Sequence, residues 1–291
     1  MSSVTLSAPA KINLTLEVLG RRDDGYHDVA SIMQTVDLYD TVTLQDAAET
    51  ALECDRPELE TQDNLALEAA NEICEATGHD RAVKIVLKKR IPVAAGLGGG
   101  SSDAAAVLKG LDSLWRLGLP PDELNAIAAR LGSDVPFFLQ GGTAMVQGRG
   151  ERVRPLPHAD VDWLVVLSPP IKLSEKTGTL YSMLSSSSYT RGMLTRKLEA
   201  RIRGGGDVPA EFLFNAFDDV ARSAFPGLDE CWSTFESLGA REVHLAGSGP
   251  SLLAIVPTKE QGTAISLMLK HKHGWEAHLV GPARPDQVLS A

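Results

Sequence analysis

Apolar and polar positions alternate through the first half of the chain in patterns that predict several strands. Every second residue from Ile12 to Val18 is apolar, which predicts a half-buried strand. The turn signal Asp23-Asp24-Gly25 separates this strand from the next apolar segment. Comparable patterns predict further strands over residues 29–38, 41–44, 83–88, 143–147 and 151–156.

Three segments of the same half carry the spacing and the end signals of helices. Asp63-Asn64 can cap the first of them, and Gly78 can stop it. The second follows directly after the glycine-rich run of residues 96–100, so this run opens a helix. Helices are predicted over residues 64–77, from the glycine run to residue 115, and over residues 121–131.

The second half begins with a strand of the buried type and then changes to longer helical segments. Two or three helices are expected between residues 179 and 225, interrupted by surface loops at 185–188 and 204–206. Strands are predicted over residues 163–167, 243–245, 252–256 and 277–280, with a helix over residues 259–271 before the last one. The change of pattern predicts a domain boundary near residues 155–160.

Composition narrows the class of protein. The chain has 291 residues, of which 43% are hydrophobic and 23% charged, so we expect a globular protein of about two domains. Its formal net charge of −10 disfavours nucleic acids and anionic membranes as partners, although a local basic pocket stays compatible with it.

Cysteine usage and hydropathy indicate a cytoplasmic location. Cys54, Cys74 and Cys231 are sparse, odd in number and not at metal-ligand spacing, which predicts reduced thiols. We expect neither a signal peptide at the start of the chain nor a membrane span, which needs about 20 apolar residues.

The glycine-rich run carries the strongest chemical signal. Glycines let backbone N–H groups approach a phosphate, and the first turn of the following helix adds unpaired N–H groups. Ser101 and Ser102 can donate hydroxyl hydrogen bonds or offer an oxygen to Mg²⁺, or one of them can simply cap the helix. The run is not a Walker A sequence, because no lysine follows at the required place, and it lacks the third glycine of a Rossmann fingerprint.

Lys11 and Asp134 are candidates for catalysis only if the fold brings them together. Alone, Lys11 is an exposed strand lysine and Asp134 a helix cap before Pro136. Together, the carboxylate can accept a proton from a substrate hydroxyl group, and the lysine can keep it ionised and offset developing negative charge.

Three widely spaced segments, residues 9–14, 96–105 and 245–251, resemble the motifs of the GHMP kinases, named for galactokinase, homoserine kinase, mevalonate kinase and phosphomevalonate kinase. The resemblance spans nearly the whole chain. It implies two α+β domains with the active site in the cleft between them. The first, residues 1–157, would be an ATP-binding domain similar to a ribosomal-protein domain, and the second, residues 158–291, a ferredoxin-like substrate domain.

The resemblance implies roles for individual residues. Asp134 corresponds to the catalytic base, Lys11 to its charged neighbour, and Asn13 to a contact of the substrate. The residues that would wrap the phosphates of ATP are Gly96, Leu97, Gly98, Gly99, Gly100, Ser101 and Ser102. Asn64 and Lys89 correspond to positions on the adenosine side of the pocket.

The resemblance also implies the class of substrate. Tyr26 and His27 match residues that hold a cytosine ring, and Tyr181 matches a second aromatic that completes a sandwich. We therefore expect Mg-ATP to phosphorylate a small alcohol linked to cytidine diphosphate, in a monomer or homodimer. Two alternatives stay open: a kinase for homoserine, mevalonate or a sugar, and a sensory protein that has lost catalysis. The role of Asp103 beside the glycine run is undecided.

Overall fold

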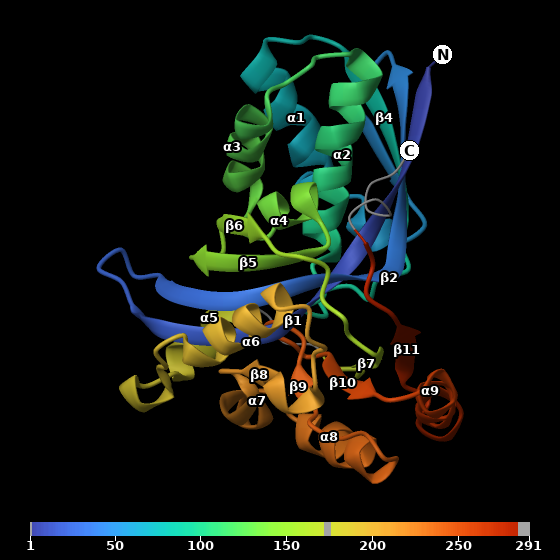
Figure 1. The fold of residues 1–291 in the computed structure, drawn as a ribbon. Helices are drawn as coiled ribbons and strands as arrows, with labels where there is room; N and C mark the ends of the chain where they lie inside the picture. Colours follow the sequence, from blue (N-terminus) through green and yellow to red (C-terminus); the bar gives the residue numbers. More distant parts are fainter. Residues whose placement is uncertain (1, 172–175, 285–291) are drawn as a thin grey trace.

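Two β-sheets, each covered by helices, form the protein in this computed structural model, which describes residues 2–171 and 176–284 (Figure 1). The strands are β1 (Ser3–Arg21), β2 (His27–Ala47), β3 (Ala51–Cys54), β4 (Ala82–Lys88), β5 (Thr143–Gly148), β6 (Arg152–Pro155), β7 (Trp163–Ser168), β8 (Phe214–Asn215), β9 (His244–Leu245), β10 (Leu252–Val256) and β11 (Glu276–Val280). The α-helices are α1 (Leu65–Thr77), α2 (Gly99–Trp115), α3 (Pro121–Leu131), α4 (Val135–Gln140), α5 (Lys176–Met183), α6 (Met193–Arg203), α7 (Asp218–Ala224), α8 (Leu228–Ser237) and α9 (Lys259–His273).

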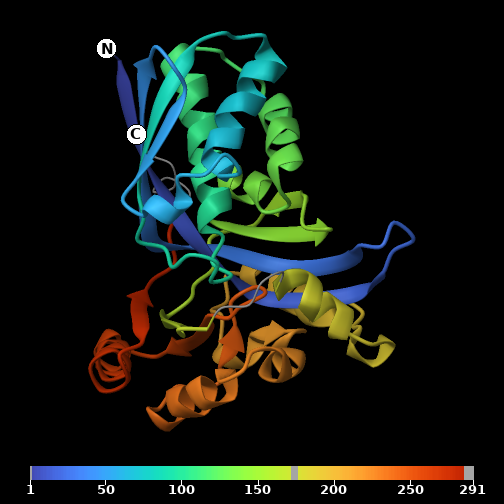
Figure 2. The ribbon, with the colours of Figure 1, turned by 180° about the vertical axis from the view of Figure 1, so that it is seen from behind.

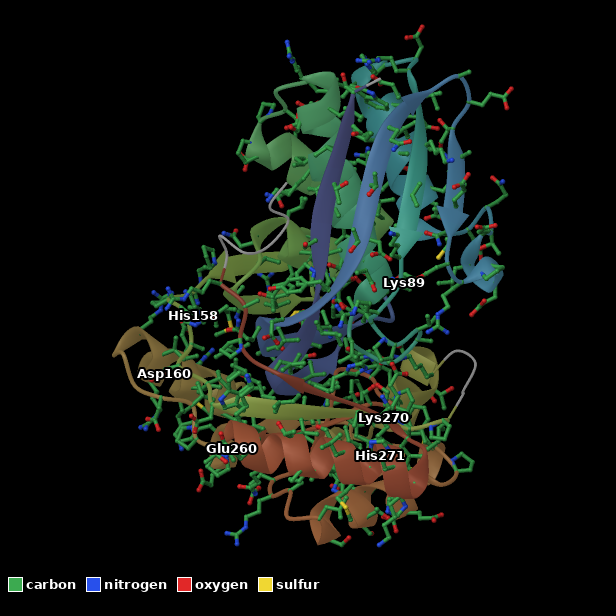
Figure 3. The ribbon with its side chains drawn as sticks, turned by 90° about the vertical axis from the view of Figure 1, so that its right-hand side faces the viewer. Lys89, His158, Asp160, Glu260, Lys270 and His271 are labelled. Atoms are coloured by element: carbon green, nitrogen blue, oxygen red, sulfur yellow. The ribbon has the colours of Figure 1, made fainter. Side chains whose placement is uncertain are left out.

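The larger sheet has seven strands, in the order β3-β4-β2-β1-β8, with β5 and β6 branching from β2. Helices α1, α2 and α3 cover one face of it (Figures 1 and 2), and Figure 3 shows the sheet from its other side. The smaller sheet has the order β11-β7-β10-β9 and is antiparallel. Helix α9 lies along the outside of this sheet (Figure 3).

Strand β1 was expected to be half-buried, but both of its faces are buried from Lys11 to Val18. The reason is non-local, since the second half of the chain covers the polar side of the strand. Strand β8 pairs in parallel with β1, and α6 brings Thr195, whose backbone N–H donates to the Glu17 carboxylate over 2.7 Å. Burial of these polar side chains is tolerated because they are hydrogen-bonded.

Local signals located most of the other elements. Asn64 caps α1 through a hydrogen bond from the Ala66 N–H, and Gly78 ends the helix in the left-handed conformation. Residues 29–38 and 41–44, predicted as two strands, form the single strand β2. Elements that the sequence patterns did not predict are β3, β8, α4 and α8. The expected surface loop at 185–188 is an exposed 3₁₀ turn over Ser186–Ser188.

The two halves share a hydrophobic core. One buried cluster joins Ile12 and Leu14 of β1 to Leu164 of β7 and Leu253 of β10. Apart from β8, the strands of the large sheet come from the first half of the chain, and those of the small sheet come from residue 163 onward. The boundary after residue 157 stays a prediction. No helix in the described parts of the chain is long and apolar enough to cross a membrane.

Candidate active site

A cleft of about 1280 Å³ receives side chains from both halves of the chain. Strand β1 contributes Lys11, the segment before α4 contributes Asp134, and α5 contributes Tyr181 from the second half. The fold thus brings three widely separated positions to one space.

Lys11 and Asp134 face each other in this cleft, with Nζ 3.7 Å from Oδ2. The Lys11 side chain is only 6% exposed, whereas that of Asp134 is 37% exposed and therefore open to a ligand. Lys11 Nζ also donates to Asn13 Oδ1 over 2.8 Å, and Asn13 Nδ2 donates to Ser31 Oγ over 2.8 Å. The lysine is held by hydrogen bonds that leave the carboxylate accessible.

The backbone fixes both members of the pair. The Lys11 N–H donates to the Leu97 carbonyl over 2.9 Å, which ties β1 to the glycine-rich run. Asp134 stands at the cap position of α4, but its side chain makes no capping hydrogen bond. The carboxylate is therefore not engaged in capping the helix.

The glycine-rich run forms a tight turn at the start of α2. Gly96 and Gly98 adopt φ values of +85° and +72°, where side chains are strained. A Cβ atom on Gly98 would lie 2.7 Å from Phe138 Cζ, so only glycine fits against α4. Gly96, Gly98, Gly99, Gly100 and Ser101 line the cleft, whereas Leu97 and Ser102 are buried behind it. The 17-residue helix α2 begins here with its unpaired N–H groups and the positive end of its dipole.

A second turn meets this one from the other half. Gly247, Ser248 and Gly249 connect β9 to β10, and the Ser251 N–H donates to the Ala95 carbonyl over 3.2 Å. A Cβ atom on Gly96 would lie 2.9 Å from the Gly249 nitrogen. The two turns are thus in direct backbone contact.

Lys89, which was expected on the adenosine side of the pocket, lines the cleft as part of a buried ion cluster. Its ammonium group donates to Asp40 over 2.5 Å and also pairs with Asp103. Figure 3 shows Lys89 where β4 ends, toward the smaller sheet. Burial alone would lower the pKa of Lys89, but the two carboxylates raise it, so the residue is a charged member of the cluster.

The Asp103 side chain, whose role was undecided from the sequence, is a member of this buried cluster. Its carboxyl group faces Lys89, yet its Oδ1 atom has no hydrogen-bond partner. Burial raises the pKa of Asp103 to about 7, Lys89 opposes this rise, and the charge of Asp40 adds to it. Asp40 accepts hydrogen bonds from the Arg90 and Ile91 N–H groups, so the cluster also anchors the segment before the glycine-rich run.

Asn64 lines the cleft, but its side chain is engaged in the protein. The oxygen accepts from the Ala66 N–H and the nitrogen donates to the Leu59 carbonyl, each over 2.9 Å. A ligand in the cleft would therefore meet an Asn64 side chain whose two polar atoms are already hydrogen-bonded within the protein.

Aromatic residues gather at the far end of the cleft. His27 stacks on Tyr181 with ring centroids 4.6 Å apart and an angle of 18°. Tyr26 is 55% exposed, and the Arg149 guanidinium lies 4.8 Å from its ring centroid. One face of the Tyr181 ring is thus covered by His27, and the Tyr189 hydroxyl group lies 3.4 Å from His27 Nε2.

The environment of these rings shifts two pKa values. Burial and the charge of Arg21 lower the pKa of His27, which favours the neutral imidazole with one donor and one acceptor. Burial and the charge of Asp134 raise the pKa of Tyr181 to about 12, so its hydroxyl group stays protonated. The two rings are thus uncharged near neutral pH, while Arg21 and Arg149 line the same end of the cleft.

Four residues of the site carry no clear signal in the sequence: Asp40, Arg149, Lys176 and Tyr189. Asp40 lies 49 positions from Lys89, and Tyr189 lies 162 positions from His27. Pairings of this range depend on the tertiary fold. The one available hint was Asp103, a carboxylate followed by three alanines in a helix that is otherwise suited to burial.

Residues 64–142 match the GHMP kinase N-terminal domain, and residues 202–274 match the GHMP kinase C-terminal domain. A Dehalococcoides mccartyi protein named 4-diphosphocytidyl-2-C-methyl-D-erythritol kinase is 42% identical over 283 residues, which are 97% of this chain and 99% of the relative. A Symbiobacterium thermophilum protein of the same name is 43% identical over 257 residues, covering 87% of this chain and 90% of the relative.

Solved structures agree with these relatives. The crystal structure of a 4-(cytidine 5'-diphospho)-2C-methyl-D-erythritol kinase superposes with a TM-score of 0.81 at 32% identity. The superposition covers 96% of this chain and all of the other chain.

Proposed function

The chain belongs to the GHMP kinase family, and we propose that it transfers the γ-phosphoryl group of ATP to the 2-hydroxyl group of 4-diphosphocytidyl-2-C-methyl-D-erythritol. This reaction belongs to the non-mevalonate, or methylerythritol phosphate, pathway of isoprenoid biosynthesis. The observation that carries the proposal is the cleft itself, where the Lys11–Asp134 pair, the glycine-rich turn and the ring pair His27–Tyr181 meet.

The Lys11–Asp134 pair would carry out the proton transfer. Asp134 takes the proton from the 2-hydroxyl group as its oxygen bonds to the γ-phosphorus, and the bond from that phosphorus to the β–γ bridging oxygen breaks to release ADP. Lys11, 3.7 Å from Asp134, offsets negative charge that develops on the phosphoryl oxygens. The N–H groups at the start of α2 hold the remaining phosphates.

The cleft also fits a magnesium ion that arrives with the nucleotide. No cluster of three or more histidine, cysteine or acidic side chains suited to a metal occurs in residues 2–171 and 176–284. Mg²⁺ is commonly held by substrate phosphates with one or two protein oxygens, and the Ser101 hydroxyl group at the cleft can provide one. The ion would supply further charge neutralisation on the phosphates.

The aromatic residues at the far end of the cleft would bind the cytosine base. We propose that cytosine displaces His27 from the face of Tyr181 or enters between Tyr26 and that pair, and that the neutral His27 ring then hydrogen-bonds the base. Stacking between aromatic rings is favourable at centroid distances such as the 4.6 Å between His27 and Tyr181.

The test is ADP release by the purified protein with Mg-ATP and 4-diphosphocytidyl-2-C-methyl-D-erythritol, run beside mevalonate, homoserine and galactose. Turnover with the cytidylyl substrate alone is the expected result. Turnover with another alcohol alone would retain the kinase chemistry and overturn the substrate. ATP binding without turnover of any alcohol would favour a sensory role on a kinase scaffold.

We further propose a cytoplasmic protein that acts as a monomer or homodimer, without a nucleic-acid or membrane partner. The free thiols of Cys54, Cys74 and Cys231 support a reducing location. Sedimentation of the purified protein would give the oligomeric state.

A further inference from the structure

Lys176, at the start of α5, is a third cation in the cleft that the proposed chemistry has not used. Its ammonium group is half-buried and lines the same space as Lys11 and Asp134. The partners found for it are two backbone carbonyl groups, those of Ala94, at 2.7 Å, and Gly249. One belongs to the segment before the glycine-rich run, and the other to the turn that meets it from the second half.

This setting is unusual for a lysine because no carboxylate within residues 2–171 and 176–284 forms an ion pair with it. The charged group that faces it among the described residues is another cation, Lys11 of β1, while Asp134 lies beyond at 3.7 Å from Lys11. Burial lowers the pKa of Lys176, and the charge of Lys11 adds to this, bringing it to about 8. Two cations that converge between two glycine turns form a site for an anion with several charges.

We propose that Lys176 binds phosphate oxygens in the cleft, exchanging its two carbonyl partners for them when the ligand enters. The residue is then a phosphate-binding group supplied by the second half of the chain, opposite the helix start of α2. This inference rests on the proposed kinase function. The location between Ala94 and Gly249 favours the triphosphate of ATP over the diphosphate of the acceptor, since both turns border the glycine-rich run.

A structural role makes a different prediction. If Lys176 only links the two turns, its hydrogen bonds to the two carbonyl groups stabilise the fold, and its charge does not affect nucleotide affinity. The neighbouring Thr177 makes an uncharged link of this kind to the second turn, because its hydroxyl group lies 2.9 Å from Ser248 Oγ. Binding measurements on charge-altering variants separate these roles.

The test uses the full chain and titration calorimetry with ATP and with CDP, each with Mg²⁺. Lys176→Met removes the charge and keeps the length, and Lys176→Arg keeps the charge. Lys259→Met is the matched control, because it removes a lysine that lies over Trp163, on a helix outside the smaller sheet. A charge-assisted hydrogen bond corresponds to an affinity loss of about 10- to 100-fold, which we expect for Lys176→Met, with near wild-type affinity for Lys176→Arg and Lys259→Met.

The pattern of loss identifies the ligand. Weaker ATP binding alone assigns Lys176 to the donor, and weaker CDP binding alone assigns it to the acceptor. Unchanged binding of both ligands by Lys176→Met, or equal losses in the Met and Arg variants together with a lower Tm, would overturn the proposal. Nucleotide binding needs no correct alcohol, so a wrong acceptor assignment leaves this test intact.

Affinity should also depend on pH. Below about pH 8 Lys176 is protonated in the free protein, and affinity for the phosphate ligand should fall as pH rises through that value. In Lys176→Arg the guanidinium stays charged, so this fall should disappear. A fall that persists unchanged in the arginine variant would contradict a phosphate-binding role.

Discussion

At the scale of single residues, Asp134 has the geometry of a general base, since its carboxylate is exposed to the cleft and free of capping bonds. Replacement by asparagine keeps the shape and removes the basic group. We expect Asp134→Asn to lower kcat by about 10²- to 10⁴-fold, measured by ADP release, because proton transfer contributes about that much.

Nucleotide affinity is the control for this variant. The glycine-rich turn and α2 do not depend on the Asp134 side chain, so ATP should bind Asp134→Asn within a few-fold of the wild type. Near wild-type turnover would remove Asp134 from the mechanism.

The buried cluster of Asp40, Lys89 and Asp103 predicts a dependence of stability on pH. The pKa of Asp103 is raised to about 7 in the folded state, above the ordinary carboxyl value of 3.8. As pH falls through about 7 the folded protein takes up a proton that the unfolded chain does not, so this group makes the free energy of unfolding larger toward pH 4.

Asp103→Asn mimics the protonated form at every pH. We expect the free energy of unfolding of this variant, relative to wild type, to gain on the order of a few kcal/mol between pH 5 and pH 8. Urea titrations at both pH values measure it. A difference between the two proteins that stays constant with pH would show that Asp103 is ionised throughout.

At the scale of elements, the turn before α2 depends on close approach to α4. Gly98→Ala would place its Cβ atom 2.7 Å from Phe138 Cζ at a φ of +72°. Backbone strain there costs roughly 1–2 kcal/mol and overpacking about 1–3 kcal/mol more. We expect a loss of stability from both causes and weaker ATP binding.

Gly118→Ala is the matched control for the strain. Gly118 has a φ of +67°, but a Cβ atom there meets nothing within 4 Å. Unfolding by urea should show the strain cost alone, with ATP affinity retained. Equal losses in the two variants would mean that the contact with Phe138 is unimportant.

Elements with signals at both ends were predictable, and those defined by distant partners were not. Helix α1 carries its cap and its stop in the sequence, and both act as expected. The burial of β1 was misjudged because Asn13, Thr15 and Glu17 look solvent-exposed until β8 and α6 cover them. Strand β8 has two residues and pairs with a strand about two hundred positions away, which no local pattern encodes.

The candidate site follows the same division. Lys11, Asp134 and the glycine-rich run were found from motifs, and the structure brings them together in one cleft. Lys176 was not found, because a lone lysine near the start of a weakly amphipathic helix is common on protein surfaces. Only its placement between two turns makes it a candidate.

At the scale of the whole molecule, the shared core predicts that the halves unfold together. Ile12 and Leu14 pack with Leu164 and Leu253 across the two sheets, so unfolding one half exposes apolar surface of the other. We expect one cooperative transition in urea.

Tryptophans report each half separately. Trp115 lies on α2 and Trp232 on α8. Variants whose only tryptophan is Trp115 or Trp232, with Trp163 and Trp275 also replaced, should give coincident fluorescence transitions. Two separated midpoints would instead show independently stable units, with the predicted boundary after residue 157 as their junction.

The long antiparallel strands β1 and β2 carry two separate parts of the candidate site along their length. Lys11 and Asn13 lie in its middle, where the glycine-rich turn is tied to it, while Tyr26 and His27 lie at its free end. With the roles proposed above, the residues that carry the chemistry and the residues that select the substrate occupy separate parts of one hairpin. Substitution or exchange of residues 22–27 would then change the acceptor without altering Lys11 or Asn13.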